Sequence, residues 1–319
     1  MKERSLPLGI DIGQTRLRVA HAVRGADGPQ VRAVAVRDIS AGAATSGAIA
    51  DPPYVAALLE EALRELKTPE RRCVAAIGAP GASLQPITLP SMTRFERDSA
   101  ARFEAERYVD FPMSEAVVRV HPAGTPGCYV LGVVRTSILS GRVESLRRAG
   151  LKPLAIDHEA FALARAFPQF DAVVDVGCER TALHAVCASV PSSFYAPGGG
   201  AQITGGIAQD LGIDEHSAEK RKRILGVAGA GEGALATLVD SICALVRIAR
   251  QTAPIVRMAL IGNASRLPRL GAAVEAVTGA SCEIAVAPVL QNTAYPDDVL
   301  RSGCQDWTLA AALTTWSRR

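Results

Sequence analysis

Two aspartates are each followed, two residues later, by a glycine at the end of a short apolar run. The pairs are Asp11 with Gly13 and Asp175 with Gly177. A tight glycine turn exposes backbone N–H groups that can hold phosphate oxygens, and a nearby carboxylate can hold the water shell of a Mg²⁺ ion. One such motif is common in ordinary turns. Two copies half a chain apart predict a phosphate and metal site built from two similar halves.

Each motif lies in a predicted hairpin. Apolar residues alternate or run together over 7–23 and again over 172–186, and a tight turn follows the glycine each time. Residues 31–39 predict a further antiparallel strand, and 91–150 a small inserted α+β module. Further strands are expected over 73–77, 117–120, 129–134, 255–261 and 282–285. Apolar spacings of three and four predict helices over 54–66, 94–108, 138–146, 201–211, 214–224, 235–251, 267–278 and 306–317.

Composition excludes several classes of protein. The chain has 319 residues, 48% hydrophobic and 21% charged, which is typical of an ordinary globular protein of about two domains. A formal charge of +3 does not indicate a nucleic-acid-binding protein. Seven scattered cysteines without a Cys-x-x-Cys pair indicate reduced core residues. No apolar run reaches the roughly 18 residues of a membrane helix, and the start has no apolar signal core, so we expect a cytoplasmic chain without a membrane span.

The two turns and a third segment together resemble known motifs. With Leu260–Pro268, which reads Leu-Ile-Gly-Asn-Ala-Ser-Arg-Leu-Pro, they resemble the phosphate-1, phosphate-2 and adenosine motifs of the actin-like ATPase superfamily. More narrowly, the chain resembles the PilM family of type IV pilus assembly proteins, themselves similar to the cell-division protein FtsA. The similar stretches follow the family's order over nearly the whole chain: 89–90, 103–112, 148–153, 157–165, 197–204, 218–222 and 310–313.

The resemblance implies an α/β fold, the actin-like (ribonuclease H-like) two-lobed ATPase fold with an inserted α+β IC subdomain. Subdomain IA would comprise residues 1–85, with 153–172 and 300–319 returning to it. Residues 86–152 would be the inserted subdomain IC, and 173–299 the second lobe, IIA and IIB.

The resemblance also implies which residues meet the phosphates and the metal. The first lobe would supply Asp11, Gly13, Gln14, Thr15 and Arg16, and the second Asp175 and Gly177. Mg²⁺ would be held by way of Asp11 and Asp175. Glu159 would help to position the metal and an attacking water, and a surface or helix-capping carboxylate is an equally open interpretation.

At the nucleoside end, the implied residues come from three segments. They are Gly199 and Gly200 at a helix start, whose dipole favours anions, then Glu219 with Lys222, then Gly262 with Asn263. Glu219 and Lys222 resemble the pair that contacts ribose and base, and a solvated ion pair on one helical face is the equal alternative. The chain departs from the family's pattern at Asn263, where a second glycine is usual, and at Arg16 and Arg18, where small residues and then a lysine are usual.

The function implied is that of a cytoplasmic nucleotide-binding scaffold for type IV pilus assembly. It would bind ATP with Mg²⁺ between its lobes, and the cytoplasmic amino-terminal peptide of a PilN-like inner-membrane protein near the IA and IC junction. It would lie peripheral to the inner membrane through its partners, with other pilus platform proteins or a second copy as further candidates. As an enzyme it would be at most a slow Mg²⁺-dependent ATPase. Two alternatives stay open: a nucleotide-free structural adaptor of a pilus or type II secretion platform, and a small-molecule kinase of the same superfamily.

Overall fold

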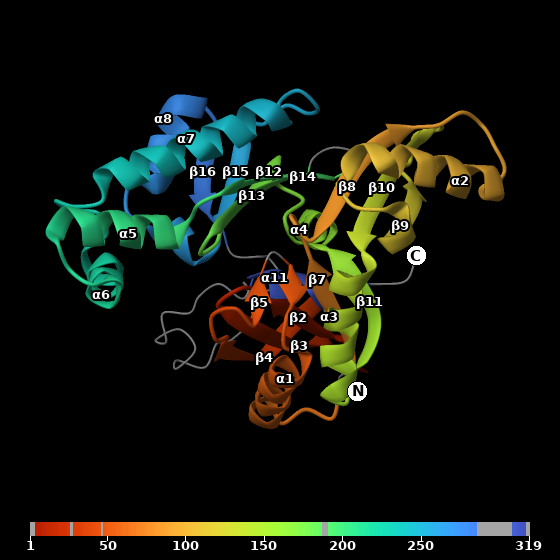
Figure 1. The fold of residues 1–319 in the computed structure, drawn as a ribbon, viewed down its shortest axis with the longest axis horizontal. Coiled ribbons are helices and arrows are strands. Elements are labelled where there is room, and N and C mark those ends of the chain that lie inside the picture. The colour runs from red at the N-terminus through yellow and green to blue at the C-terminus, as the bar shows by residue number, and fades with distance from the viewer. Residues whose placement is uncertain (1–3, 26–27, 46, 187–190, 286–307, 317–319) are drawn as a thin grey trace. The chain divides into compact units, whose positions relative to one another are not determined.

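A computed structural model describes residues 4–25, 28–45, 47–186, 191–285 and 308–316. The chain divides into two compact units (Figure 1). Unit 1 comprises residues 1–166, 189–193 and 287–319, and unit 2 comprises 167–188 and 194–286. The start of the predicted closing helix, 306–307, and its last residue, 317, lie outside the described residues. The predicted subdomain boundaries stay a prediction.

The main sheet of unit 1 combines an antiparallel hairpin with parallel strands. Its order is β1-β3-β2-β7-β11, with β4 also paired to β3. The strands are β1 (Arg4–Ser5), β2 (Leu8–Ile12), β3 (Arg16–Gly25), β4 (Gly28–Asp38), β7 (Arg72–Ile77) and β11 (Lys152–His158). Because β2, β7 and β11 run parallel, their carboxyl ends lie along one edge of the sheet. In open α/β sheets this is the edge at which ligands bind.

Helices α1 (Pro52–Leu66) and α11 (Thr308–Leu313) pack against this sheet. Helix α1 begins where the Asp51 side chain accepts a hydrogen bond from the Tyr54 N–H at 2.9 Å. Helix α11 is buried along its whole length and approaches β2 so closely that a Cβ at Gly9 would lie 1.8 Å from the Ala310 carbonyl oxygen. Only glycine leaves room for this contact.

A second, three-stranded sheet in unit 1 belongs to the inserted α+β module. Its antiparallel order is β8-β10-β9, from β8 (Ala82–Thr88), β9 (Ala116–Pro122) and β10 (Cys128–Arg135). Helix α2 (Arg94–Ala105) packs on it and begins with a capping box between Thr93 and Glu96. Helix α2 ends earlier than the predicted 108, because the chain tightens into a 3₁₀ turn over Glu106–Tyr108. Helix α3 (Thr136–Arg148) follows β10 and packs on α1.

Unit 2 repeats the hairpin-plus-parallel arrangement. Its sheet order is β14-β13-β12-β15-β16, with β12 antiparallel to β13 and parallel to β15. The strands are β12 (Ala172–Val176), β13 (Arg180–Ala185), β14 (Ser192–Pro197), β15 (Arg257–Ile261) and β16 (Ser281–Ile284). The helices are α5 (Gly200–Leu211), α6 (Glu215–Leu225), α7 (Glu232–Ala249) and α8 (Leu270–Thr278), with a 3₁₀ turn over Asn263–Arg266.

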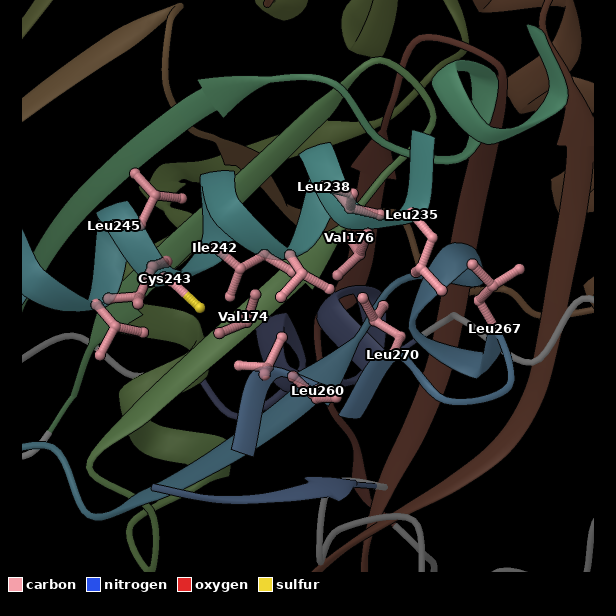
Figure 2. Close-up of a cluster of buried hydrophobic side chains, with 14 of the residues drawn as sticks. Val174, Val176, Leu235, Leu238, Ile242, Cys243, Leu245, Leu260, Leu267 and Leu270 are labelled. Carbon is pink, nitrogen blue, oxygen red and sulfur yellow. The ribbon is translucent and has the colours of Figure 1, made fainter. Parts of the chain in front are cut away.

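The core of unit 2 lies between helix α7 and the sheet. Figure 2 shows Leu238 and Ile242 of α7 pointing toward Val174 of β12 and Leu260 of β15. All four side chains are at most 1% exposed. Burying one leucine fully stabilises a fold by about 1.5–3 kcal/mol. This packing fixes the ends of β12, which contains Asp175, and of β15, which Gly262 follows.

Among the described residues, the predicted elements lack strands β8, β11 and β14, the two-residue strands β1, β5 (Ala44–Thr45) and β6 (Ala48–Ile49), and helix α4 (Glu159–Ala166). Strand β8 contains Pro86, which is tolerated because β8 is an edge strand of its sheet. In β11 the register with β7 shifts between Pro153 and Ala155, and that irregularity breaks the alternation that marks a strand. Helix α7 begins at Glu232, three residues before the predicted start.

Candidate functional site

The first glycine turn joins β2 to β3. The Gly13 N–H donates to the Arg16 carbonyl at 2.9 Å, and the Thr15 carbonyl accepts from the Ile39 N–H at 2.8 Å. Gln14 and Thr15 therefore form the tip of a hairpin that is also tied to the residue after β4. Asp11 lies at the carboxyl end of β2, directly before the turn.

Two arginines of β3 are held by aspartates. Arg18 pairs with Asp11 at 2.9 Å between Nη1 and Oδ2, and these side chains are only 9% and 14% exposed. Arg16 pairs with Asp38 at 3.2 Å, where the carboxylate is largely exposed. The Arg18 guanidinium therefore compensates the charge of Asp11 within a nearly closed environment.

Glu159 begins helix α4 at the same sheet edge as Asp11. It is 7% exposed and follows β11, just as residue 78 follows the parallel neighbour β7. A Cβ built on Gly78 would lie 1.9 Å from Glu159 Oε2, so the carboxylate rests against the backbone there. Unit 1 thus gathers the predicted carboxylates Asp11 and Glu159 at the carboxyl ends of its parallel strands. Gly78 was not among the predicted site residues, because glycine is common after a strand and a single one does not distinguish a functional site from an ordinary turn.

The second glycine turn repeats the first bond for bond. The Gly177 N–H donates to the Arg180 carbonyl at 2.9 Å, the same distance and spacing as in the first turn. The start of helix α5 lies on this turn, since the Gly200 N–H donates to the Gly177 carbonyl at 2.9 Å. At Gly199 a Cβ would lie 2.4 Å from that carbonyl oxygen. The turn and the helix start can therefore approach only through glycine.

Asp175 has a different neighbour from Asp11. Its register partner on β13 is Ala182, and Arg180 Nη2 lies 3.8 Å from its Oδ2. Gly262, with a φ of +90°, lies on the other side, where a Cβ would be 2.6 Å from Asp175 Oδ1. The Asn263 side chain is exposed.

Glu219 and Lys222 of helix α6 are joined to helix α5. Glu219 binds Lys222 at 2.6 Å and Arg223 at 2.9 Å, and accepts a hydrogen bond from the Thr204 hydroxyl at 2.6 Å. Burial raises the pKa of the Glu219 carboxyl, but hydrogen bonds from Lys222, Thr204 and Arg223 outweigh it and bring the pKa to about 2. The Lys222 ammonium also donates to the Gly200 carbonyl at 2.8 Å.

Gly200 is the point at which these segments of unit 2 meet. A Cβ placed on it would contact Ala264 Cβ at 3.4 Å, Lys222 Nζ at 3.5 Å and the Gly177 carbonyl oxygen at 3.6 Å. The predicted phosphate turn, helix start, α6 cation and segment after Gly262 are therefore neighbours. Thr204, which joins α5 to Glu219, stood in the similar stretch but not among the predicted site residues.

The described residues hold neither a cluster of direct metal ligands nor a membrane-spanning helix. Within them, no three histidine, cysteine, aspartate or glutamate side chains gather as direct ligands of a metal ion. A Mg²⁺ held through water by a single carboxylate does not need such a group. Across the same residues, no helix has the length and apolar character to cross a bilayer.

A hairpin continued by parallel strands, present once in each unit, defines the actin-like ATPase fold. Two solved structures share it: ethanolamine utilization protein EutJ from Carboxydothermus hydrogenoformans and the cytoplasmic domain of EpsL of Vibrio cholerae. EutJ has 14% identity and a TM-score of 0.61 over 98% of this chain and 90% of its own. EpsL has 11% identity and a TM-score of 0.51 over 98% and 96%. At these identities the likeness concerns the fold alone.

The family is defined more narrowly. The family model of type IV pilus assembly protein PilM matches residues 9–285, and the chain belongs to this family. It is also similar to a solved PilM-PilN type IV pilus biogenesis complex, with 26% identity and a TM-score of 0.85 over 97% of each chain. A search of curated protein sequences finds no match. The predicted family and fold class are thereby confirmed.

Proposed function

We propose that this chain is a nucleotide-binding scaffold of type IV pilus assembly that binds ATP through its two glycine turns and the residues around Gly200. The observation that carries the proposal is the convergence on Gly200 of the second turn, the start of α5 and the Lys222 ammonium. A glycine turn, a helix start and a lysine together offer N–H groups, a favourable dipole and a positive charge to phosphate oxygens.

The residues of unit 2 have distinct roles in this proposal. The Gly177 turn and the dipole of the twelve-residue helix α5 hold the phosphates. Lys222 lies close enough to Gly200 to exchange its bond with that carbonyl for a phosphate oxygen. Glu219 stays ionised beside it and, together with Gly262 and Asn263, faces the nucleoside.

Asp175 holds the water shell of Mg²⁺, which when bound neutralises charge on the β- and γ-phosphates. From unit 1, Gly13 and the tip of the first turn bind phosphate through backbone N–H groups. Glu159 accepts a hydrogen bond from water at the same sheet edge, with its carboxylate fixed against Gly78. The chemistry this permits is slow hydrolysis at most, with the nucleotide acting chiefly as a conformational ligand.

The proposed partner is the cytoplasmic amino-terminal segment of a PilN-like inner-membrane protein. Its support is the similarity to the chain solved in a PilM-PilN complex, which extends over 97% of both chains. Through this partner the protein would be held at the cytoplasmic face of the inner membrane.

Gln14, Thr15 and Arg16 belong to the first turn, and we propose that they contact the phosphates together with Gly13.

The test is titration with a fluorescent ATP analogue in Mg²⁺ buffer. The wild-type chain should bind saturably, and Lys222→Ala should weaken binding about tenfold, since one hydrogen bond to a charged group contributes about 1.5–3 kcal/mol. Lys220→Ala, an exposed lysine of the same helix, is the matched control and should bind within about twofold of wild type. Absence of saturable binding at millimolar nucleotide would overturn the proposal in favour of a nucleotide-free adaptor.

A further inference from the structure

We infer that Thr204 of helix α5 is a positioning residue of the proposed nucleotide site, because its hydroxyl group holds Lys222 and Glu219 of helix α6 where they would meet a nucleotide. This role deepens the proposed function and rests on it for the identity of the ligand. The position of the Lys222 ammonium is a property of the chain without nucleotide, and it can be tested separately.

Thr204 differs from an ordinary helical threonine in its neighbours. A threonine inside a helix commonly hydrogen-bonds the carbonyl four residues earlier, and the exposed Thr237 of α7 does so at 3.0 Å. Thr204 lies 3.0 Å from the Gly200 carbonyl oxygen in the same way, but it is only 7% exposed. Its Oγ1 is also 2.6 Å from Glu219 Oε2 and 2.7 Å from Lys222 Nζ. Thr204 therefore joins two ionised side chains of α6 to α5, which Thr237 does not do for its own helix.

The direction of these hydrogen bonds follows from the donors available. A hydroxyl group has one proton to donate, and lysine has donors only. Lys222 must therefore donate to Thr204 Oγ1. The hydroxyl proton then goes to the Glu219 carboxylate at 2.6 Å and not to the Gly200 carbonyl at 3.0 Å, since hydrogen bonds to an ionised acceptor are the stronger ones. The hydroxyl group thus links the ammonium to the carboxylate in a single chain of bonds.

All three N–H donors of the Lys222 ammonium are in use. They meet the Gly200 carbonyl at 2.8 Å, Thr204 Oγ1 at 2.7 Å and Glu219 Oε2 at 2.6 Å, and an ammonium group has only three donors. A phosphate oxygen can be bound only if one of these bonds is given up. The bond to Gly200 is the longest, and its acceptor is neutral, so a phosphate replaces it at the least cost.

Thr204 and Glu219 keep their bonds to Lys222 during such an exchange. The ammonium group then stays beside the start of α5 and does not have to be ordered from solvent when a nucleotide arrives. A group that is held in place before binding loses less conformational entropy on binding. Thr204 therefore supports nucleotide affinity without a contact of its own to the nucleotide.

The first experiment measures how fast Lys222 of the full nucleotide-free chain is acylated by N-hydroxysuccinimide acetate, with mass spectrometry as the readout. The Lys222 side chain is 12% exposed, so it should react slowly in the wild type. Thr204→Val, which puts a methyl group of similar size in place of the hydroxyl group, should speed the reaction at least about threefold through loss of a hydrogen bond. Thr204→Ser should restore the wild-type rate. Thr237→Val is the matched control and should change nothing, and the exposed Lys220 is the internal reference.

The second experiment repeats the ATP-analogue titration in Mg²⁺. Thr204→Val should weaken binding by up to the loss of about tenfold expected of Lys222→Ala. The double variant should lose no more than Lys222→Ala alone, because both changes act through one ammonium group. Thr204→Ser should bind like the wild type.

Three results would overturn the inference: an unchanged Lys222 acylation rate in a folded Thr204→Val variant, no rescue by Thr204→Ser, or additive losses of affinity. If Thr204→Val fails to fold by circular dichroism, Thr204→Ala replaces it, since alanine is the best helix former. Failure of both to fold would also count against the inference, because a residue that only places Lys222 is not needed for folding. A chain that binds no nucleotide but shows the acylation pattern loses the proposed function and keeps Thr204 as the residue that places Lys222.

Discussion

The carboxylate of Glu159 lies directly against the backbone of Gly78, although 81 positions separate them in the chain. A Cβ at residue 78 would be 1.9 Å from Glu159 Oε2 and 2.2 Å from its carboxyl carbon. The contact exists because β7 and β11 are parallel neighbours that end side by side. Residue 78 thus controls where the Glu159 carboxylate can lie.

Gly78→Ala is expected to displace Glu159 while the fold persists, because the clashing atoms belong to the end of a flexible side chain. Any ATP hydrolysis should fall to the level of Glu159→Gln, and the double variant should show no further loss, since the two changes act on one carboxylate. Phosphate release in single and double variants checks this. Gly205→Ala, a helical glycine with no neighbouring atom within 4 Å, should leave the rate unchanged. Additive losses from Gly78→Ala and Glu159→Gln would contradict the coupling.

The ion pairs of Glu219 predict a pH-dependent contribution to stability. Its folded pKa is about 2, below the ordinary 4.5, so the stabilisation is complete above about pH 4.5 and is lost as pH falls toward 2. Glu219 is partly exposed, and screening limits the expected contribution to about 1 kcal/mol. Urea unfolding of wild type and Glu219→Gln should differ by that amount at pH 7 and converge near pH 2–3. A difference that grew at low pH would refute the assigned ion pairs.

Gly9→Ala is expected to destabilise unit 1 by at least about 1–3 kcal/mol, the usual cost of overpacking. The added methyl group would meet the backbone carbonyl of Ala310, which cannot turn aside as a side chain can. Limited proteolysis should then release fragments ending before α11, and the melting temperature should fall. Gly233→Ala, in α7 with open space around it, is the control and should leave both unchanged. Wild-type protease resistance in Gly9→Ala would exclude this packing.

Nucleotide and partner peptide are expected to affect each other reciprocally. If ATP changes the affinity of a PilN-like amino-terminal peptide by some factor, the peptide must change the affinity of ATP by the same factor. Fluorescence anisotropy of the labelled peptide, with and without saturating ATP analogue, measures the first, and the reverse titration measures the second. Lys222→Ala, at an analogue concentration too low to occupy it, should show the nucleotide-free peptide affinity. If the peptide affinity is the same with and without the ATP analogue, the two binding events are independent and the expected coupling is contradicted.

The sequence allowed the local parts of the site to be predicted well. Asp-x-Gly within two alternating apolar runs specifies a strand, a turn and a returning strand, and both turns carry the same N–H to carbonyl bond, at Gly13 and Gly177. The glycine run before α5 was predicted for a related reason, since only glycine permits the approach seen at Gly199. Such features depend on a few neighbouring residues.

Features that depend on strands distant in sequence could not be predicted. The contact of Gly78 with Glu159 needs the parallel pairing of β7 and β11, which no local pattern encodes. The cross-strand partner of Asp11 is Arg18, and that of Asp175 is Ala182. These partners follow from the register of each hairpin, which the spacing of Asp-x-Gly does not specify. Strand β11 itself was missed because its bulge disturbs the alternation.

The contact of α11 with β2 fixes the order in which the two units can be completed during synthesis. Strand β2, which carries Asp11, is covered by a helix that leaves the ribosome roughly 300 residues later, some 15–60 s at ordinary translation rates. All the elements of unit 2 lie between them along the chain and have been made by then. Strand β2 therefore receives its covering helix only after the whole of unit 2 has been synthesised.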